Sequence, residues 1–288
     1  MKRASPNASV PASIVRRRGA APEHVRDLLA AEEPMEIRLR EGGAPAERLV
    51  VTMRTPGDDE DLAVGLLFGE GVIRSIDEVV SVERPSDPRI DPELARNVVV
   101  VTLTKDPARA ARTPRRATVM GSACGVCGRT TIEEVVGLGA RCREGARSAG
   151  NAAAGVTIDP SVLTALPEKL RERQDGFAAT GGLLAAGLFE ADGLLLVARE
   201  DVGRHNATDK VIGALLRSRR PVPPLLLVSG RLGFEIAQKA ALAGIQVVAA
   251  ISAPTSLAVD LADEAGITLI GFLRGETFNV YTHPGRIG

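Results

Sequence analysis

Hydrophobic and polar positions in the first half of the chain follow two different periods. Between residues 35 and 54 apolar and polar residues alternate in two runs around residues 41–44, which predicts a β-hairpin. Residues 59–69 place acids in a first turn and apolar residues at helical spacing, which predicts a helix. Apolar runs at 79–82 and 97–103 predict two more strands. The first half therefore indicates a small α+β domain.

The second half has a more regular pattern. Short apolar runs alternate with helical segments, and Gly244 and Gly266 end two of the helices. Buried strands that alternate with helices indicate right-handed parallel β-α-β crossovers and a layered α/β domain. The predicted elements are a helix over 162–173, a hairpin over 183–198, a helix over 206–217, and then strands at 224–228, 246–251 and 267–272 separated by helices at 232–243 and 257–265.

Composition limits the class of protein. The 288 residues suggest two domains, and 44% hydrophobic but only 2% aromatic residues predict an aliphatic core. Acidic and basic residues balance at 36 each, which argues against bulk attraction to nucleic acid or to an anionic membrane. Three cysteines, no signal-peptide pattern and no long apolar run predict a soluble protein of the reducing cytoplasm. The predicted organisation is a disordered lead-in over 1–30, an α+β domain over 31–118, a mobile cysteine loop and linker over 119–155, and an α/β domain over 156–288.

Two of the three cysteines lie in one glycine-rich stretch. Cys124 and Cys127 are three residues apart, with glycines around them and Arg129 after them. Glycine makes such a loop costly to fix, and a nearby arginine favours the thiolate form of a cysteine. An exposed thiolate on a mobile loop is a good sulfur nucleophile, which suits a carrier of persulfide sulfur.

Other uses of a cysteine pair fit less well. A closed zinc site needs two further ligands, but Cys142 has no partner at a metal-ligand spacing and the three histidines are scattered, so no metal site is predicted. A thioredoxin-like disulfide would lie at the start of a helix in a β-α-β unit near the N-terminus. In this chain a glycine-rich linker surrounds the cysteine pair instead. The His-x-Glu and Pro-Cys-x-x-Cys elements of a zinc deaminase are absent from the sequence.

Three polar clusters follow predicted elements of the second half, at 200–206, 229–231 and 274–277. Ligands of parallel α/β sheets bind beyond the carboxyl ends of the strands. A glycine allows the backbone to approach an anion, and a neighbouring arginine offers a bidentate donor, so the clusters suggest a ligand with several phosphates. The alternative interpretation is that the three clusters are turns that carry surface charges and bind no ligand. His205 is either a buried hydrogen-bonded residue or a ligand contact. The arginines of the three clusters, which are the expected phosphate contacts, are Arg204, Arg231 and Arg274.

Several strings of the chain resemble the formate dehydrogenase accessory sulfurtransferase family (FdhD). The similarity extends over about residues 34–287. It implies an α/β second half of the cytidine-deaminase type without the deaminase zinc site, and a homodimer. One position departs from the family pattern, because Leu184 stands where a histidine is usual. The strings that carry the resemblance are 56–65, 69–71, 124–128, 200–207, 209–210, 252–258, 274–275 and 278–284.

The resemblance also implies an activity. Members take sulfur from a cysteine desulfurase as a persulfide and pass it to a molybdenum (or tungsten) bis-molybdopterin guanine dinucleotide cofactor destined for formate dehydrogenase. Cys124 matches the persulfide position, and Cys127 would assist. A carrier that binds the cofactor without chemistry and a thiol–disulfide switch remain as alternative hypotheses. The expected cofactor contacts are Phe272, Leu273, Arg274, Gly275, Glu276 and Thr277, together with Arg204, His205, Ser229 and Arg231.

Overall fold

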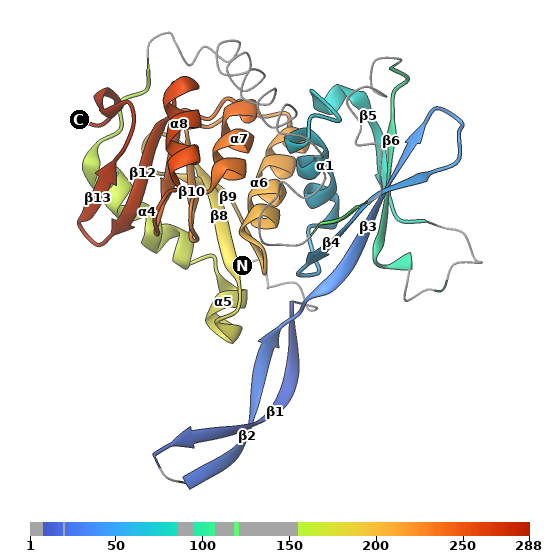
Figure 1. Cartoon of the computed structure of the whole chain (residues 1–288), viewed down its shortest axis with the longest axis horizontal. Helices are drawn as coiled ribbons and strands as arrows, with labels where there is room; N and C mark the ends of the chain where they lie inside the picture. The colour runs from blue at the N-terminus through green and yellow to red at the C-terminus, as the bar shows by residue number, and fades with distance from the viewer. Residues whose placement is uncertain (1–7, 20, 86–90, 92–94, 107–117, 121–154) are drawn as a thin grey trace.

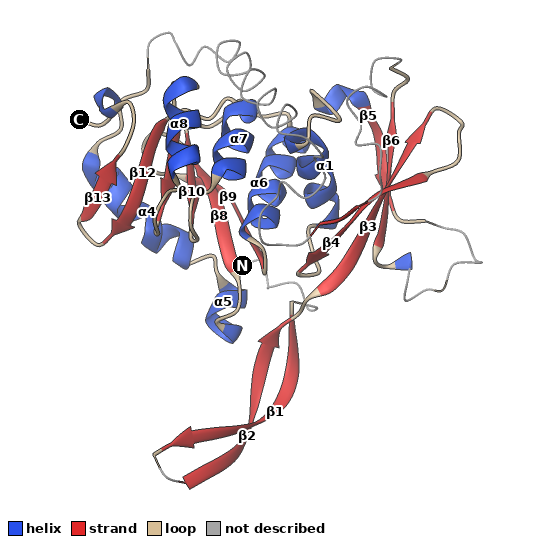
Figure 2. Cartoon of the chain, in the orientation of Figure 1, coloured by secondary structure: helices blue, strands red, loops and turns tan. Residues whose placement is uncertain are grey.

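The computed structural model describes residues 8–19, 21–85, 91, 95–106, 118–120 and 155–288. Two sheets form its body, and most of the helices lie between them or against the second sheet (Figures 1 and 2). A two-stranded ribbon extends away from this body at the N-terminal side (Figure 1).

The N-terminal half builds a five-stranded sheet with the order β5-β6-β3-β4-β7. Pairing is parallel between β3 and β6 and between β4 and β7, and antiparallel elsewhere. The predicted hairpin, helix and two strands are all confirmed. The elements are β3 (Glu33–Glu41), β4 (Glu47–Arg54), α1 (Asp59–Gly69), a short 3-10 helix (Ile76–Glu78), β5 (Val79–Glu83), β6 (Val98–Leu103) and β7 (Thr118–Met120).

The C-terminal half builds a six-stranded sheet with the order β13-β12-β11-β10-β8-β9. β10, β11 and β12 are parallel, as the alternation of strands and helices predicts, and β8 and β13 run antiparallel to their neighbours. The elements are α4 (Pro160–Arg171), α5 (Asp175–Thr180), β8 (Leu184–Phe189), β9 (Leu195–Asp201), α6 (Arg204–Ser218), β10 (Leu225–Val228), α7 (Phe234–Ala243), β11 (Val247–Ala250), α8 (Ser256–Glu264), β12 (Thr268–Arg274), β13 (Thr277–Val280) and a 3-10 turn (Pro284–Arg286).

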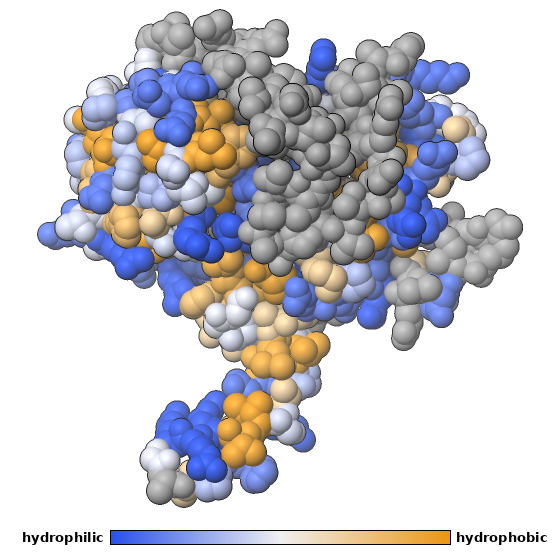
Figure 3. Space-filling model, in the orientation of Figure 1, coloured by the Kyte–Doolittle hydropathy of each residue, from blue (hydrophilic) through white to orange (hydrophobic). Residues whose placement is uncertain are grey.

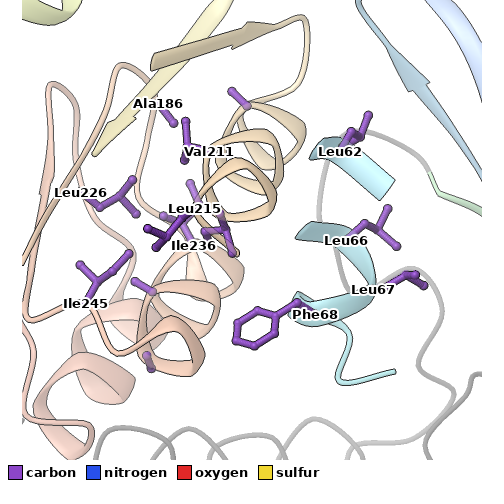
Figure 4. Packing of buried hydrophobic residues seen from close by; sticks show 14 of the residues in the cluster. Leu62, Leu66, Leu67, Phe68, Ala186, Val211, Leu215, Leu226, Ile236 and Ile245 are labelled. Carbon is purple, nitrogen blue, oxygen red and sulfur yellow. The ribbon is translucent and has the colours of Figure 1, made fainter. Parts of the chain in front are cut away.

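The two halves meet through helices α1 and α6, which touch backbone to backbone. A β-carbon added at Gly65 would lie 1.9 Å from the carbonyl oxygen of Asp209, and one added at Gly213 would lie 1.9 Å from that of Asp61. Only glycine allows this approach. Around the crossing, Leu66 and other apolar residues of α1 share one buried cluster with α6, α7 and the second sheet (Figure 4). The cluster is largely aliphatic, as the composition predicts.

The prediction of a disordered lead-in over residues 1–30 is wrong for the described part of that segment. β1 (Ser9–Arg18) and β2 (Ala21–Ala30) pair antiparallel over their whole length. Both strands contain a proline, a residue that central strands exclude. A two-stranded ribbon has only edge strands, however, and edges tolerate proline. The ribbon carries exposed apolar side chains, and Figure 3 shows orange surface on it. These side chains are Val10, Val15, Leu28 and Leu29.

Candidate functional site

Four strands of the second sheet end at one common edge. β10, β11 and β12 are parallel, and β9 runs in the same direction because it is antiparallel to β8, which is antiparallel to β10. Loops and helix N-termini beyond such an edge offer free N–H groups to ligands. The three clusters singled out from the sequence follow β9, β10 and β12, so the fold places all of them at this edge.

Arg204 begins α6 and lies against Gly230, in the loop after β10. A β-carbon added at Gly230 would lie 3.5 Å from Cβ and 3.5 Å from Cδ of Arg204. Ser229 fixes this loop, because it donates its N–H to the carbonyl of Ala185 (2.9 Å) and accepts the N–H of Ala185 on its hydroxyl (2.8 Å). Nε of Arg204 is buried and has no hydrogen-bond partner among the described residues. The structure therefore holds a donor at this position that a bound anion would satisfy.

The loops after β10 and β11 and the end of β12 are joined by hydrogen bonds. Leu232 donates its N–H to Ala253 (3.1 Å), and Thr255 donates its N–H to Leu232 (3.0 Å). Nε of Arg274 donates to the carbonyl of Ile251 (2.9 Å). The three loops therefore form one continuous surface, and Arg204 continues it through its contact with the β10 loop.

The predicted contacts in the last two strands differ in exposure. Leu273 is fully buried in the core on the α4 side of the sheet, so its side chain packs against the protein and only its backbone faces the edge. The others lie at the surface around the turn between β12 and β13. Exposed side chains of the predicted set are Arg231, Phe272, Arg274, Glu276 and Thr277, and Gly275 is exposed with them.

His205 is buried one residue into α6, and its partner was not foreseen from the sequence. Its Nε2 lies 3.2 Å from Oε2 of Glu235, within ion-pair distance but not aligned as a hydrogen bond. Burial acts to raise the pKa of Glu235. The interaction of the Glu235 carboxylate with His205 and with the charge of Lys239 nevertheless holds this pKa below the ordinary value for glutamate. The sequence signal for this partner is Glu235 itself, an acid in the first turn of α7 two residues after Gly233.

A second charged pair lies one helical turn deeper. Lys239 donates to both carboxylate oxygens of Asp209 at 2.5 Å, and both residues are nearly withdrawn from solvent. Burial raises the pKa of Asp209 against the opposing effect of Lys239. Asp209 and Lys239 follow His205 and Glu235 by four residues, so the two pairs cross between α6 and α7 side by side. They join the start of α6 firmly to α7 behind the loop that follows β10.

Two of the strings that carry the family resemblance, 200–207 and 209–210, both bind Thr55, the residue directly before the string 56–65. The carboxylate of Asp201 accepts hydrogen bonds from the backbone N–H of Thr55 (3.1 Å) and Gly203 (3.0 Å) and from Nδ2 of Asn206 (3.0 Å). Nζ of Lys210 lies 2.8 Å from the same carboxylate and donates to the carbonyl of Thr55 (2.9 Å). These residues hold the loop before α1 against the carboxyl end of β9, which is a structural role for both strings.

Leu184 borders the same edge. Its Cδ2 lies 3.7 Å from the position of a β-carbon at Gly230, next to the contact with Arg204. Leu184 begins β8 and is half-buried. The edge is therefore apolar at this point, between two cationic segments.

A cavity of about 690 Å³ lies beside β9, bounded by the loop before α1, the start of α5 and the outer side of α6. Its wall includes Arg199, whose guanidinium pairs with Asp61 (2.8 Å). Glu200 also lines it and accepts the backbone N–H groups of Gly176 and Phe177, while burial raises its pKa. Arg204, Arg231 and Arg274 do not line this cavity. The predicted anion contacts therefore belong to the carboxyl edge instead.

Cys124, Cys127 and Cys142 lie outside the described residues, and so do residues 121–154 of the predicted cysteine loop and linker. The last described residue before Cys124 is Met120, which pairs with Thr52 of β4. In the described ranges no group of three or more His, Cys, Asp and Glu residues could hold a metal ion. No helix in that part of the chain is long and apolar enough to cross a membrane.

The fold and its edge define a class: a two-sheet α/β protein with cationic loops gathered at the carboxyl ends of parallel strands. The chain belongs to the FdhD/NarQ family, whose model matches residues 30–288. A sulfur carrier protein FdhD of Nocardia farcinica is 47% identical over 278 residues, which cover 95% of this chain and 93% of the relative. One of Sulfurisphaera tokodaii is 44% identical over 264 residues, covering 91% and 92%.

The fold is also that of a solved structure. A crystal structure from Desulfotalea psychrophila, described as a formate dehydrogenase accessory protein, superposes with a TM-score of 0.69 and covers 98% of this chain and 100% of the other. The two sequences are 23% identical, so this likeness shows the fold alone. It agrees with the mixed α/β architecture expected from the sequence.

Proposed function

We propose that this protein accepts sulfur from a cysteine desulfurase as a persulfide on Cys124 and transfers it to a molybdenum or tungsten bis-molybdopterin guanine dinucleotide cofactor. That cofactor is the cargo of the reaction and is destined for formate dehydrogenase. Membership of the FdhD/NarQ family and curated relatives named as sulfur carriers support the sulfur step. The protein acts in the cytoplasm, as a homodimer in the family's manner.

The observation that carries the cofactor part is the buried, unpartnered Nε of Arg204 beside Gly230. A buried donor without an acceptor is unfavourable and is expected where a ligand supplies the acceptor. Arg231 and Arg274 lie exposed on the same edge and can pair with further phosphate oxygens. A cofactor with two pyrophosphate groups offers several acceptors to such a row.

The sulfur step uses the chemistry of a thiolate. The thiolate of Cys124 attacks the outer sulfur of the desulfurase persulfide, a new S–S bond forms on Cys124, and the desulfurase cysteine leaves as its thiolate. Cys127 assists in one of two ways. As a relay, its thiolate takes the outer sulfur and Cys124 leaves as its thiolate; as a resolving residue, it attacks the inner sulfur, a Cys124–Cys127 disulfide forms, and the outer sulfur leaves as sulfide for the cofactor. No net oxidation occurs in the first exchange, because one S–S bond replaces another.

Formate dehydrogenase activity in cells that carry single cysteine substitutions tests this proposal. Cys124→Ala is expected to abolish the activity, while Cys142→Ala serves as the matched control and retains it. Full activity with both Cys124→Ala and Cys127→Ala would overturn the proposal and favour a carrier that performs no chemistry. A reversible disulfide between Cys124 and Cys127, with no persulfide formed, would instead identify a thiol–disulfide switch.

A further inference from the structure

β12 contains an irregularity at the predicted edge. Gly271 pairs with Asn279 and Arg274 pairs with Thr277, so two residues of β12 oppose one residue of β13. This is a β-bulge, and such bulges re-aim side chains near functional sites. Leu273 takes the buried core position after the bulge, and Phe272 is turned outward with 40% of its surface exposed.

Phe272 adopts a strained backbone conformation. Its φ is 54°, in the left-handed region that side chains larger than glycine rarely occupy. The neighbouring loop holds it there, because the N–H of Phe272 donates to the carbonyl of Ser252 (3.1 Å). Pro254 packs closely against Gly271, the residue before Phe272, because a β-carbon added at Gly271 would lie 2.7 Å from Cδ of Pro254. Strain that the surroundings impose in this way is concentrated at ligand sites.

Tyr281 lies over the same glycine. Its Cε2 is 3.1 Å from the position of a β-carbon at Gly271, and 39% of the side chain is exposed. The chain has one tyrosine, six phenylalanines and no tryptophan, so aromatic residues are scarce. In the part of the chain that the structure describes, Phe272 and Tyr281 are the only aromatic residues among the exposed large hydrophobic side chains. Both therefore lie beside Gly271, in the second half of β12, instead of filling the core.

Cations accompany this aromatic pair. Arg274 follows the bulge and is tied to the carbonyl of Ile251, and Arg231 lies exposed on the loop after β10. Aromatic rings next to arginines bind nucleotides, because the rings stack on the base and the guanidinium groups pair with the phosphates. Packing of the aliphatic core does not explain two exposed aromatic side chains at this position, and neither does an ion pair.

We propose that Tyr281 stacks on the purine base of the nucleotide bound at this edge, with Phe272 as a second aromatic contact. The inference rests on the proposed function, in which that nucleotide is the guanine dinucleotide part of the cofactor. It adds a residue that selects nucleotides over inorganic phosphates. The bulge sets the backbone conformation at Phe272, and Gly271 lets the ring of Tyr281 pack closely against β12.

The composition of the chain makes the test direct. Because the protein has no tryptophan and one tyrosine, its intrinsic tyrosine emission reports on Tyr281 alone. Titration of the full-length protein with GDP should quench that emission, after correction for light absorbed by guanine against free N-acetyltyrosinamide. Titration with pyrophosphate, which carries no base, should leave the emission unchanged. Persistent emission at GDP concentrations that calorimetry shows to be saturating would overturn the inference.

Calorimetry on substituted proteins provides a second measurement. Tyr281→Leu should weaken GDP binding by about fivefold to 100-fold, the range expected for loss of one base-stacking contact, and should leave pyrophosphate binding within about twofold. Tyr281→Phe is the matched control, because it keeps the ring and should retain GDP affinity. Equal GDP affinity in wild type and Tyr281→Leu would contradict the inference.

The inference and the proposed function fail in different ways. If GDP binds but neither the emission nor the affinity depends on Tyr281, the inference alone is wrong. If wild-type protein binds no GDP, both the inference and the nucleotide part of the proposed function are wrong. Absence of a persulfide on Cys124 would overturn the sulfur step and leave these nucleotide measurements unaffected.

Discussion

Lys210 and Asp201 form an ion pair of 2.8 Å in which both side chains are withdrawn from solvent, with 1% and 0% exposed. Both also bind the backbone of Thr55, so the pair joins the N-terminal half of the protein to the carboxyl end of β9. A buried pair of this kind determines how the two halves are oriented, and it lies next to the start of α6, where Arg204 is placed.

Removal of one partner of this pair should be strongly destabilising. Lys210→Met leaves the carboxylate of Asp201 buried without its counter-charge, and we expect a loss of about 3–5 kcal/mol in the free energy of unfolding. Urea denaturation measures it. Arg219→Met is the control, because Arg219 pairs with Asp77 at the exposed surface (2.6 Å) and should cost less than about 1 kcal/mol. Similar losses in the two variants would contradict the role of the buried pair.

The contact between α1 and α6 should not accept even one methyl group. In Gly213→Ala the new β-carbon would meet the carbonyl oxygen of Asp61, so the helices must separate, and we expect a destabilisation of about 3 kcal/mol. Thermal unfolding measures the change. Gly43→Ala is the matched control, because nothing lies within 4 Å of its added β-carbon. An unchanged melting temperature in Gly213→Ala would show that the helices do not touch as described.

Acid should weaken the fold through Asp59. Arg54 binds its carboxylate at 2.9 and 3.0 Å, and although burial acts to raise the pKa of Asp59, Arg54 and Arg84 hold it below the ordinary value of 3.8. Because the pKa is lower in the folded state, the stabilisation is present above the unfolded value and is lost as the pH falls through the folded value. Asp59→Asn should therefore be less stable than wild type near neutral pH.

The difference between Asp59→Asn and wild type should shrink as the pH is lowered, because acid protonates the wild-type carboxyl. Unfolding free energies measured from about pH 7 down to about pH 2 test this. A difference that stays constant over the whole range would show that the charge of Asp59 contributes nothing.

Relief of the strain at Phe272 should separate stability from ligand binding. Phe272→Gly places at φ 54° the residue that tolerates it, and we expect a gain of about 1 kcal/mol in stability. The same change removes an aromatic contact, so GDP binding should weaken. Melting temperature and calorimetry on one protein preparation measure the two effects. A variant that is both less stable and unaltered in GDP binding would contradict the assignment of Phe272.

Much of the fold could be predicted from local patterns. The helix over 59–69 coincides with α1, and the alternation after residue 224 gives the parallel strands and hence the edge where the three clusters gather. These features depend on periodicity and on the handedness of β-α-β units, which sequence alone carries. Clustering of Arg204 with the loop after β10 follows from the topology.

Features that depend on distant contacts could not be predicted. The sequence predicts a disordered lead-in where β1 and β2 form a ribbon, because each of these strands gains its order from the other and the segment is rich in Ser, Pro, Ala and Arg. Glu235 is distinguished only by its approach to His205 across two helices. Leu273 is an expected contact only because the family resemblance covers the whole stretch 272–277, and the bulge that turns its side chain into the core leaves no mark on the local pattern.

Mass spectrometry of the intact protein after incubation with a cysteine desulfurase and cysteine tests the central claim most directly. The account predicts one added sulfur, removed by a reducing agent and mapped to Cys124 after proteolysis under non-reducing conditions. The same treatment of Cys124→Ala should add none. Wild-type protein without added sulfur, or the same labelling in Cys124→Ala, would contradict the account.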